Sequence, residues 1–202
     1  IDASKTYDGL AYTDGNGVTY AGFVNGETNT ELGGNLTYSG TSQNAVNAGT
    51  YTITPSGLTA ANYSLTYANG TLTVNKAPLT VTANDANKTY DGLAYTGGNG
   101  VTYAGFVNGE TNAALGGTIT YTGTSQNAVN AGTYTIVPSG LTSSNYLFSY
   151  NNGSLTVGKA SATVTANSDS YTYNGLARTA SGFTATGLVN GETTAVLTGV
   201  TV

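Results

Sequence analysis

The 202-residue sequence contains no cysteine, histidine, methionine or tryptophan, and only 7% of its residues are charged. Without cysteine, the chain forms no disulfide and offers no thiolate to a metal or a substrate. Because histidine is missing too, the commonest general base is absent, and we expect no enzymatic activity. The lack of methionine indicates that the natural start lies outside this sequence, so we expect it to be part of a longer chain.

Charge is scarce and mostly negative, with 5 Lys and Arg against 10 Asp and Glu. Nucleic-acid binding needs clustered cations that displace counterions, so we expect no nucleic-acid partner. The sequence has no apolar run long enough to span a bilayer, so we expect no membrane insertion in this region. Hydrophobic residues still make up 39% of the chain, with 16 tyrosines in regular patterns. This composition favours a folded β protein.

The octapeptide KTYDGLAY occurs at residues 5–12 and again at 88–95, and an altered copy, YTYNGLAR, lies at 171–178. Residues 5–74 align with 88–157 without a gap and are identical at 56 of 70 positions. Such self-similarity is typical of repeat proteins. We therefore divide the chain into repeat 1 without its first strand (1–75), a complete repeat 2 (76–158) and the first half of repeat 3 (159–202).

Apolar and polar residues alternate within the complete repeat, as expected for half-buried strands. Leu79 and Val81 share one face, and Tyr134 and Ile136 share another. The runs LTVT, TITY, TYTIV, YLFSY and SLTV predict strands over 79–82, 118–121, 133–137, 146–150 and 154–157.

Asp-Gly and Asn-Gly pairs separate these runs and predict turns with positive φ. The four pairs begin at Asp91, Asn99, Asn108 and Asn152. One short helical turn is expected over GETNAAL (109–115), with Asn108 as its N-cap.

The predicted fold class is mainly β: tandem small β domains, each an Ig-like sandwich or a β-grasp-like sheet with one short helical turn. The joints are short, at Asn75–Pro78 and Gly158–Ser161, and Pro78 restrains the first of them. Because neither joint resembles a flexible linker, we expect the domains to follow one another as an extended rod.

The first candidate site is a turn that occurs in both of the first two repeats. We interpret Tyr7, Asp8 and Gly9 as a structural turn, in which glycine permits the bend, aspartate ties it and tyrosine packs beneath it. The second repeat has the same turn at Tyr90, Asp91 and Gly92.

No cofactor is expected, although calcium is an alternative. Asp85 and Asp91 lie close to a domain joint and could supply hard oxygen ligands there. Intramolecular isopeptide bonds are a further alternative, because Glu27, Glu110 and Glu192 occupy matching positions in the three copies. For these residues, ordinary turns and solvated side chains are the simpler interpretation.

The segments KTYDGLAYTGGNGVTYAGFVNGET (88–111), GTYTIVPSGLTSSNY (132–146) and NGSLTV (152–157) resemble the YDG/MBG-type repeats of large bacterial surface exoproteins, the filamentous-haemagglutinin-like adhesins. The resemblance covers essentially the whole chain, although the third copy departs from it at Asn174 and Arg178. It implies an extracellular fibre on the bacterial cell surface, with these domains as its shaft and no catalytic residues.

Two functions remain open at this point. The repeats are either structural spacers or modules that themselves bind glycan, matrix or one another. The expected partners are neighbouring repeats of the same chain, other copies of the chain, or host and matrix glycans.

Overall fold

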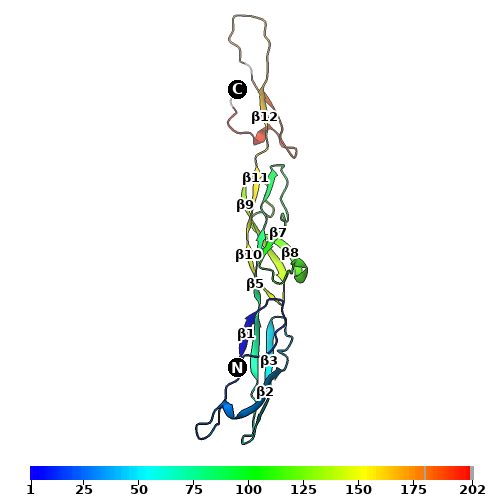
Figure 1. Cartoon of the computed structure of the whole chain (residues 1–202). Helices are drawn as coiled ribbons and strands as arrows, with labels where there is room; N and C mark the ends of the chain where they lie inside the picture. Colours follow the sequence, from blue (N-terminus) through cyan, green and yellow to red (C-terminus); the bar gives the residue numbers. More distant parts are fainter. Residues whose placement is uncertain (180, 201–202) are drawn as a thin grey trace. The chain divides into compact units, whose positions relative to one another are not determined.

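A computed structural model describes residues 1–179 and 181–200 and confirms the mainly β class. Within these residues the helical elements are three single 3-10 turns (Figure 1). The elements in chain order are β1 (Ala3–Thr6), η1 (Asn29–Glu31), β2 (Leu32–Ser39), β3 (Gly49–Ala60), β4 (Gly70–Asn75), β5 (Ala77–Ala83), β6 (Ala86–Thr89), β7 (Val101–Ala104), η2 (Asn112–Ala114), β8 (Gly116–Thr122), β9 (Gly132–Thr142), β10 (Tyr146–Asn151), β11 (Gly153–Gly158), β12 (Thr163–Ala166), β13 (Phe183–Thr186) and η3 (Thr194–Val196).

By their contacts, the residues form two compact units, and neither unit is a single sequence repeat. The first unit holds Ile1–Val81, Tyr103–Thr118 and Gly140–Ser149. The second holds Thr82–Thr102, Ile119–Ser139 and the described residues from Tyr150 onward. Segments of the second repeat therefore pack with the first repeat. The boundaries at residues 75 and 158 come from sequence register and stay predictions.

The core of the first unit lies on a four-stranded sheet with the order β1-β4-β3-β2. β1 runs parallel to β4, whereas β3 runs antiparallel to both β4 and β2. The alternation of apolar and polar residues buries one face of each strand. Residues from both repeats make up this core, namely Tyr7, Ala45, Ile53, Leu72, Val74, Ala77, Leu79 and Tyr146.

The second repeat forms its own four-stranded sheet with the equivalent order β6-β11-β9-β8. β6 again runs parallel to β11, and β9 runs antiparallel to β11. Two further sheets have the orders β10-β5-β7 and β12-β13. The hydrophobic core of the second unit consists of Ala83, Ala86, Ala128, Ile136, Leu155 and Val157.

All five strands predicted for the complete repeat are present, each extended by one to several residues. Leu79 and Val81 are fully buried, as the alternation predicted. The structure adds two four-residue strands, β6 and β7, which the sequence pattern did not indicate. At the first joint, Lys76 alone separates β4 from β5.

Two local predictions were wrong. The helical turn η2 is capped by Thr111, whose hydroxyl accepts a hydrogen bond from the backbone N–H of Ala113, and not by Asn108. Asn108 instead has a positive φ of 50° within its own turn. Gly153 of the Asn152-Gly153 pair is the first residue of β11 and has no left-handed backbone. A side chain there would meet the carbonyl oxygen of Ala83 at 2.7 Å, so a close approach of two backbones explains this glycine.

Within the described residues, no helix has the length and apolar character needed to cross a membrane.

Candidate functional site

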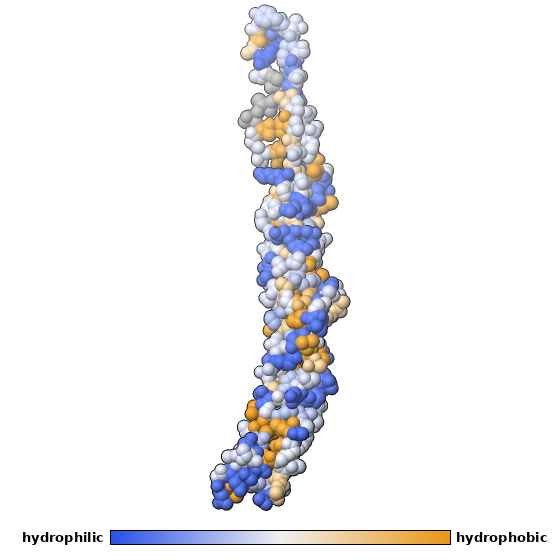
Figure 2. Space-filling model, viewed as in Figure 1, coloured by the Kyte–Doolittle hydropathy of each residue, from blue (hydrophilic) through white to orange (hydrophobic). Residues whose placement is uncertain are grey.

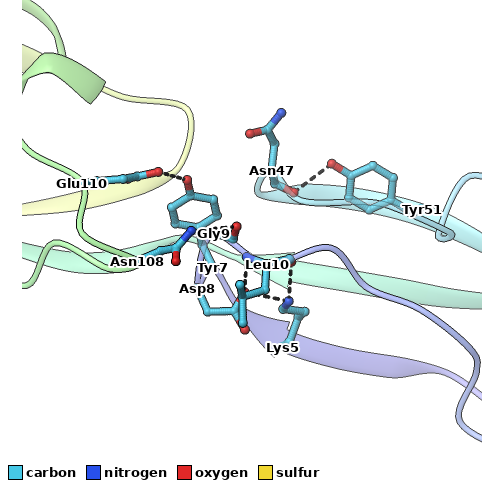
Figure 3. A network of polar contacts seen from close by, with 9 residues as sticks. All are labelled: Lys5, Tyr7, Asp8, Gly9, Leu10, Asn47, Tyr51, Asn108 and Glu110. Atoms are coloured by element: carbon cyan, nitrogen blue, oxygen red, sulfur yellow. Dashed lines mark hydrogen bonds and ion pairs between the residues drawn. The ribbon is translucent and has the colours of Figure 1, made fainter.

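The repeated YDG turn is held by a small set of contacts within each repeat. Asp8 Oδ1 accepts a hydrogen bond of 2.9 Å from the backbone N–H of Leu10, and Gly9 between them has a φ of 73°. Lys5 Nζ lies 2.7 Å from Asp8 Oδ1 and also donates to the carbonyl oxygen of Leu10 (Figure 3). Aspartate thus ties the turn, and glycine supplies the left-handed residue that other side chains rarely adopt.

The second repeat builds the same turn from the corresponding residues. Asp91 Oδ1 accepts a 3.0 Å hydrogen bond from the backbone N–H of Leu93, and Gly92 has a φ of 72°. Lys88 Nζ lies 2.7 Å from Asp91 Oδ1. In both repeats the lysine lowers the pKa of the aspartate, with a smaller contribution from the backbone N–H.

Tyr7 projects from the first turn into residues of the second repeat. It is only 4% exposed, and its hydroxyl donates to Oε1 of Glu110 (Figure 3). The hydroxyl of Tyr146 donates to the other oxygen of the same carboxylate, Glu110 Oε2. The Tyr7 and Tyr146 rings meet edge to face, with centroids 5.5 Å apart. One glutamate of the second repeat therefore joins a tyrosine from each repeat.

Asn108 adds a second contact on the same turn. Its amide Nδ2 donates a 3.3 Å hydrogen bond to the carbonyl oxygen of Gly9. A Cβ added to Gly9 would lie 2.8 Å from Cβ of Asn108, closer than side chains tolerate. Gly9 is therefore required both by its backbone conformation and by the residue packed against it.

Four further hydrogen bonds hold residues 143–145, two of them to the first repeat and two to Lys76 and Ala77 at the joint. Asn145 accepts from the backbone N–H of Ala48 through Oδ1, and its Nδ2 donates to Asn47 Oδ1. The carbonyl oxygen of Asn145 accepts from the backbone N–H of Ala77. Lys76 Nζ donates to the carbonyl oxygen of Ser143. The segment before Tyr146 is thus fixed by backbone and side-chain bonds together.

The second unit repeats the essential contacts with residues of the third repeat. The hydroxyl of Tyr90 donates to Glu192 Oε1 at 2.5 Å, and Asn190 Nδ2 donates to the carbonyl oxygen of Gly92 at 3.0 Å. A Cβ on Gly92 would lie 2.5 Å from Cβ of Asn190. We call the contact of a YDG turn with the Asn and Glu of the following repeat the YDG junction.

The tyrosine of the third repeat shows the turn without a junction. Tyr173 is 94% exposed, and none of the described residues lies within 4 Å of a Cβ placed on Gly175. A turn of this type therefore does not bury its tyrosine by itself, and the junction accounts for the burial of Tyr7.

The junction raises the pKa of its tyrosines. The hydrogen bond to Glu110, with smaller contributions from burial and from the charge of Glu110, raises the pKa of Tyr7 to about 12. Burial is the largest cause that raises the pKa of Tyr146, and the hydrogen bond to Glu110 is the second. The bond to Glu192 raises the pKa of Tyr90. These phenols stay protonated donors through the physiological pH range, so their hydrogen bonds to the glutamates hold the two repeats together.

The calcium candidates Asp85 and Asp91 lie at opposite ends of the segment that contains β6, whose four residues span about 13 Å. Asp85 Oδ1 accepts a 2.7 Å bond from the backbone N–H of Ser154, and Asp2 makes the same contact with Thr71 in the first repeat. Asp91 is engaged in its own turn. Across residues 1–179 and 181–200, no three acidic side chains come together as metal ligands.

Sequence reasoning placed Tyr7 and Tyr90 in turns but missed the residues that receive them. The matched positions of Glu27, Glu110 and Glu192 were a usable signal, although we read them as isopeptide candidates. In the structure each of these glutamates instead accepts a hydrogen bond from a tyrosine hydroxyl. Asn108 and Tyr146 carried no signal that distinguished them from ordinary turn and core residues.

The family model of the MBG domain (YGX type) matches residues 1–73 and 79–156. These two matches cover well over half of the chain, so the chain belongs to the MBG domain family, and the resemblance drawn from its motifs is confirmed. No curated protein and no solved structure matches the chain. The chain is thus a region of tandem MBG repeats joined by YDG junctions.

Proposed function

We propose that this chain is a stalk or shaft segment of a secreted bacterial cell-surface protein of the adhesin type. The observation that carries the proposal is the YDG junction, in which Tyr7 of one repeat reaches Glu110 of the next. The contact recurs between Tyr90 and Glu192. A junction that uses the same residues at successive repeats suits a structure that is extended by adding copies.

The chemistry of the junction also suits a spacer. Each repeat supplies a YDG turn toward the following repeat and an Asn-Gly-Glu turn toward the preceding one, so both surfaces come from one unit. Ring packing and hydrogen bonds to a carboxylate resist separation without any ligand. The proposal includes no catalytic activity, in keeping with a chain that lacks histidine and cysteine.

Scattering from chains with increasing numbers of complete repeats tests the proposal. A shaft requires the maximum dimension to grow by a constant increment for every repeat added. In a chain of two complete repeats, Glu110→Ala removes the acceptor of the junction tyrosines. This variant should broaden the distance distribution without unfolding the sheets. If the added repeats collapse into a compact globule, the chain is not a shaft.

The alternative that the repeats bind glycan requires an exposed aromatic patch at the same place in each repeat. Tyr20 and Tyr67 of the first repeat are 41% and 40% exposed, whereas their counterparts Tyr103 and Tyr150 are half-buried. On the face shown in Figure 2, hydrophobic residues form separate groups among polar ones. The structural role is therefore the one we propose.

A further inference from the structure

Each YDG junction contains an asparagine that is followed directly by glycine. These pairs are Asn108-Gly109 in the first junction and Asn190-Gly191 in the second. In such a pair the backbone nitrogen of the glycine can attack the side-chain amide of the asparagine, because glycine has no Cβ that obstructs the approach. The asparagine is then converted to aspartate or isoaspartate without any enzyme. Both junctions therefore contain a residue that is chemically able to lose its amide.

The attacking side of the first pair is open. None of the described residues lies within 4 Å of a Cβ placed on Gly109. The hydrogen bond that closes this turn joins the backbone N–H of Glu110 to the carbonyl oxygen of Val107, so the N–H of Gly109 takes no part in it. Asn108 is exposed, so water reaches the residue. The turn itself thus offers little protection against the reaction.

The protection comes from the other repeat. Nδ2 of Asn108 donates to the carbonyl oxygen of Gly9, and a Cβ on Gly9 would lie only 2.8 Å from Cβ of Asn108 (Figure 3). The nitrogen that donates this hydrogen bond is the same atom that deamidation expels. The bond to Gly9 must therefore break before the amide of Asn108 can react.

The second junction has the same arrangement. Nδ2 of Asn190 donates to the carbonyl oxygen of Gly92, and no described residue lies within 4 Å of a Cβ on Gly191. Asn190 and Gly191 have φ of 51° and 74°, against 50° and 72° for Asn108 and Gly109. The reactive pair and the contact that restrains it thus occur together at both junctions.

We propose that Asn108 is a deamidation site that the closed junction protects and the open junction exposes. Once the junction opens, the nitrogen of Gly109 bonds to Cγ of Asn108 and closes a succinimide ring. The side-chain nitrogen leaves as ammonia and takes up the proton from the Gly109 N–H. Water then opens the ring to a carboxylate, so that one water is consumed and one ammonia is released. The inference does not depend on the shaft function.

The product opposes closure of the junction. A carboxylate at position 108 has no N–H to donate, so two acceptors face each other where Asn108 now bonds the carbonyl oxygen of Gly9. The new negative charge also lies two positions from Glu110, which receives Tyr7. Isoaspartate in addition lengthens the backbone of the turn by one atom. An opened junction is thereby converted in one direction to a form that closes less well.

Peptide mass spectrometry of the 202-residue chain, aged at mildly alkaline pH, tests the protection. Asn108 should deamidate at least about tenfold more slowly in the chain than in a free peptide of residues 104–113 (AGFVNGETNA), because only the open fraction reacts. Tyr7→Phe and, more strongly, Tyr7→Ala should raise the rate at Asn108 without changing the sequence around it.

The Asn16-Gly17 pair is the internal reference for these variants. The amide of Asn16 donates to the carbonyl oxygen of Asp2, outside the junction. Opening of the junction raises the rate at Asn108 relative to Asn16, whereas general unfolding raises both. A rate at Asn108 equal to that of the free peptide, or an unchanged ratio in both Tyr7 variants, overturns the proposal.

Hydrogen exchange tests the effect of the product on the facing turn. Asn108→Asp should accelerate exchange of the amides in residues 7–12 by about tenfold, because the turn opens more often. The matched control is Asn16→Asp, which makes the same substitution and also removes a bond from an amide to a carbonyl oxygen. It should leave exchange in residues 7–12 unchanged. Equal exchange in the two variants would show that deamidation does not act on the junction.

Discussion

The hydroxyl of Tyr7 meets the carboxylate of Glu110 although 103 positions separate the two residues in the chain. Tyr7 follows β1 of the first repeat, and Glu110 follows the Asn-Gly turn of the second. This contact gives the repeated octapeptide a physical meaning within the chain itself: in its first two copies, the turn is a surface that receives the following repeat.

Removing the carboxylate of the junction should destabilise the first unit. Glu110→Ala leaves two buried phenol hydroxyls without their acceptor, and we expect the free energy of unfolding to fall by about 2–4 kcal/mol in urea titrations. Glu27→Ala removes the acceptor of Tyr63 alone and should cost less. Glu31→Ala, at an exposed residue of η1, is the control and should lie within about 0.5 kcal/mol of the parent. Equal effects for all three substitutions would contradict the assigned role of Glu110.

Alanine substitutions at two glycines with nearly the same φ can separate the effect of packing at the junction from the effect of backbone strain. Gly9 and Gly109 have φ of 73° and 72°, so alanine is strained at either position. Nothing lies within 4 Å of a Cβ on Gly109, whereas a Cβ on Gly9 clashes with Asn108. Gly9→Ala should therefore lower the unfolding free energy by about 1–3 kcal/mol more than Gly109→Ala. Thermal melts of the two variants would show no difference if the turn did not pack against Asn108.

Alkaline pH should open the junction. The pKa of Tyr7 is raised to about 12 in the folded chain, against an ordinary value of 10.0, because its hydroxyl is bonded to Glu110 and is buried. The unfolded chain releases this proton first, so the stabilisation is complete below pH 10 and is lost as the pH rises toward 12. Melting midpoints followed over this range should fall, and Tyr7→Phe should flatten part of the decline. A parallel decline in the Phe variant would assign the effect to other groups.

The glycines at the two ends of β11 should differ in their tolerance of a methyl group. A Cβ on Gly153 meets the carbonyl oxygens of Ala83 and Asn84 at 2.7 and 2.9 Å, whereas one on Gly158 has its nearest neighbour, Lys88 O, at 3.8 Å. Neither glycine has a positive φ. Gly153→Ala should cost about 1–3 kcal/mol of unfolding free energy, and Gly158→Ala should be near neutral or slightly stabilising. Denaturant midpoints of the two variants provide the comparison.

Removing divalent cations should leave the chain unchanged. Asp85 and Asp91 each accept hydrogen bonds from protein groups at opposite ends of β6, so we expect the same melting midpoint with a chelator as with excess calcium. Asp85→Asn is the control, because it keeps an acceptor for Ser154 and removes the charge. A rise in the midpoint with calcium that this substitution abolishes would instead establish a calcium site.

The sequence by itself determined five strands of the complete repeat, three of its four Asp-Gly and Asn-Gly turns, and the repeat itself. Alternation at Leu79 and Val81 and the left-handed preference of Gly92 are local properties, so they can be read from neighbouring residues. The same local rules assigned the cap of η2 to Asn108, whereas the hydroxyl of Thr111 caps it. They also assigned Gly153 to a turn, whereas the backbone of Ala83, which approaches Gly153 only in the folded chain, explains that glycine.

Only the tertiary structure decided which repeat receives which tyrosine and which segments become strands. The identical tetrapeptide VTYA is a strand at Val101–Ala104, where it pairs with β5, and is not a strand at Val18–Ala21, where no strand of the described residues pairs with it. A strand is completed by its neighbour's hydrogen bonds, and that neighbour comes from a distant part of the chain. For the same reason, Glu110 becomes the acceptor of Tyr7 only once two repeats have folded against each other.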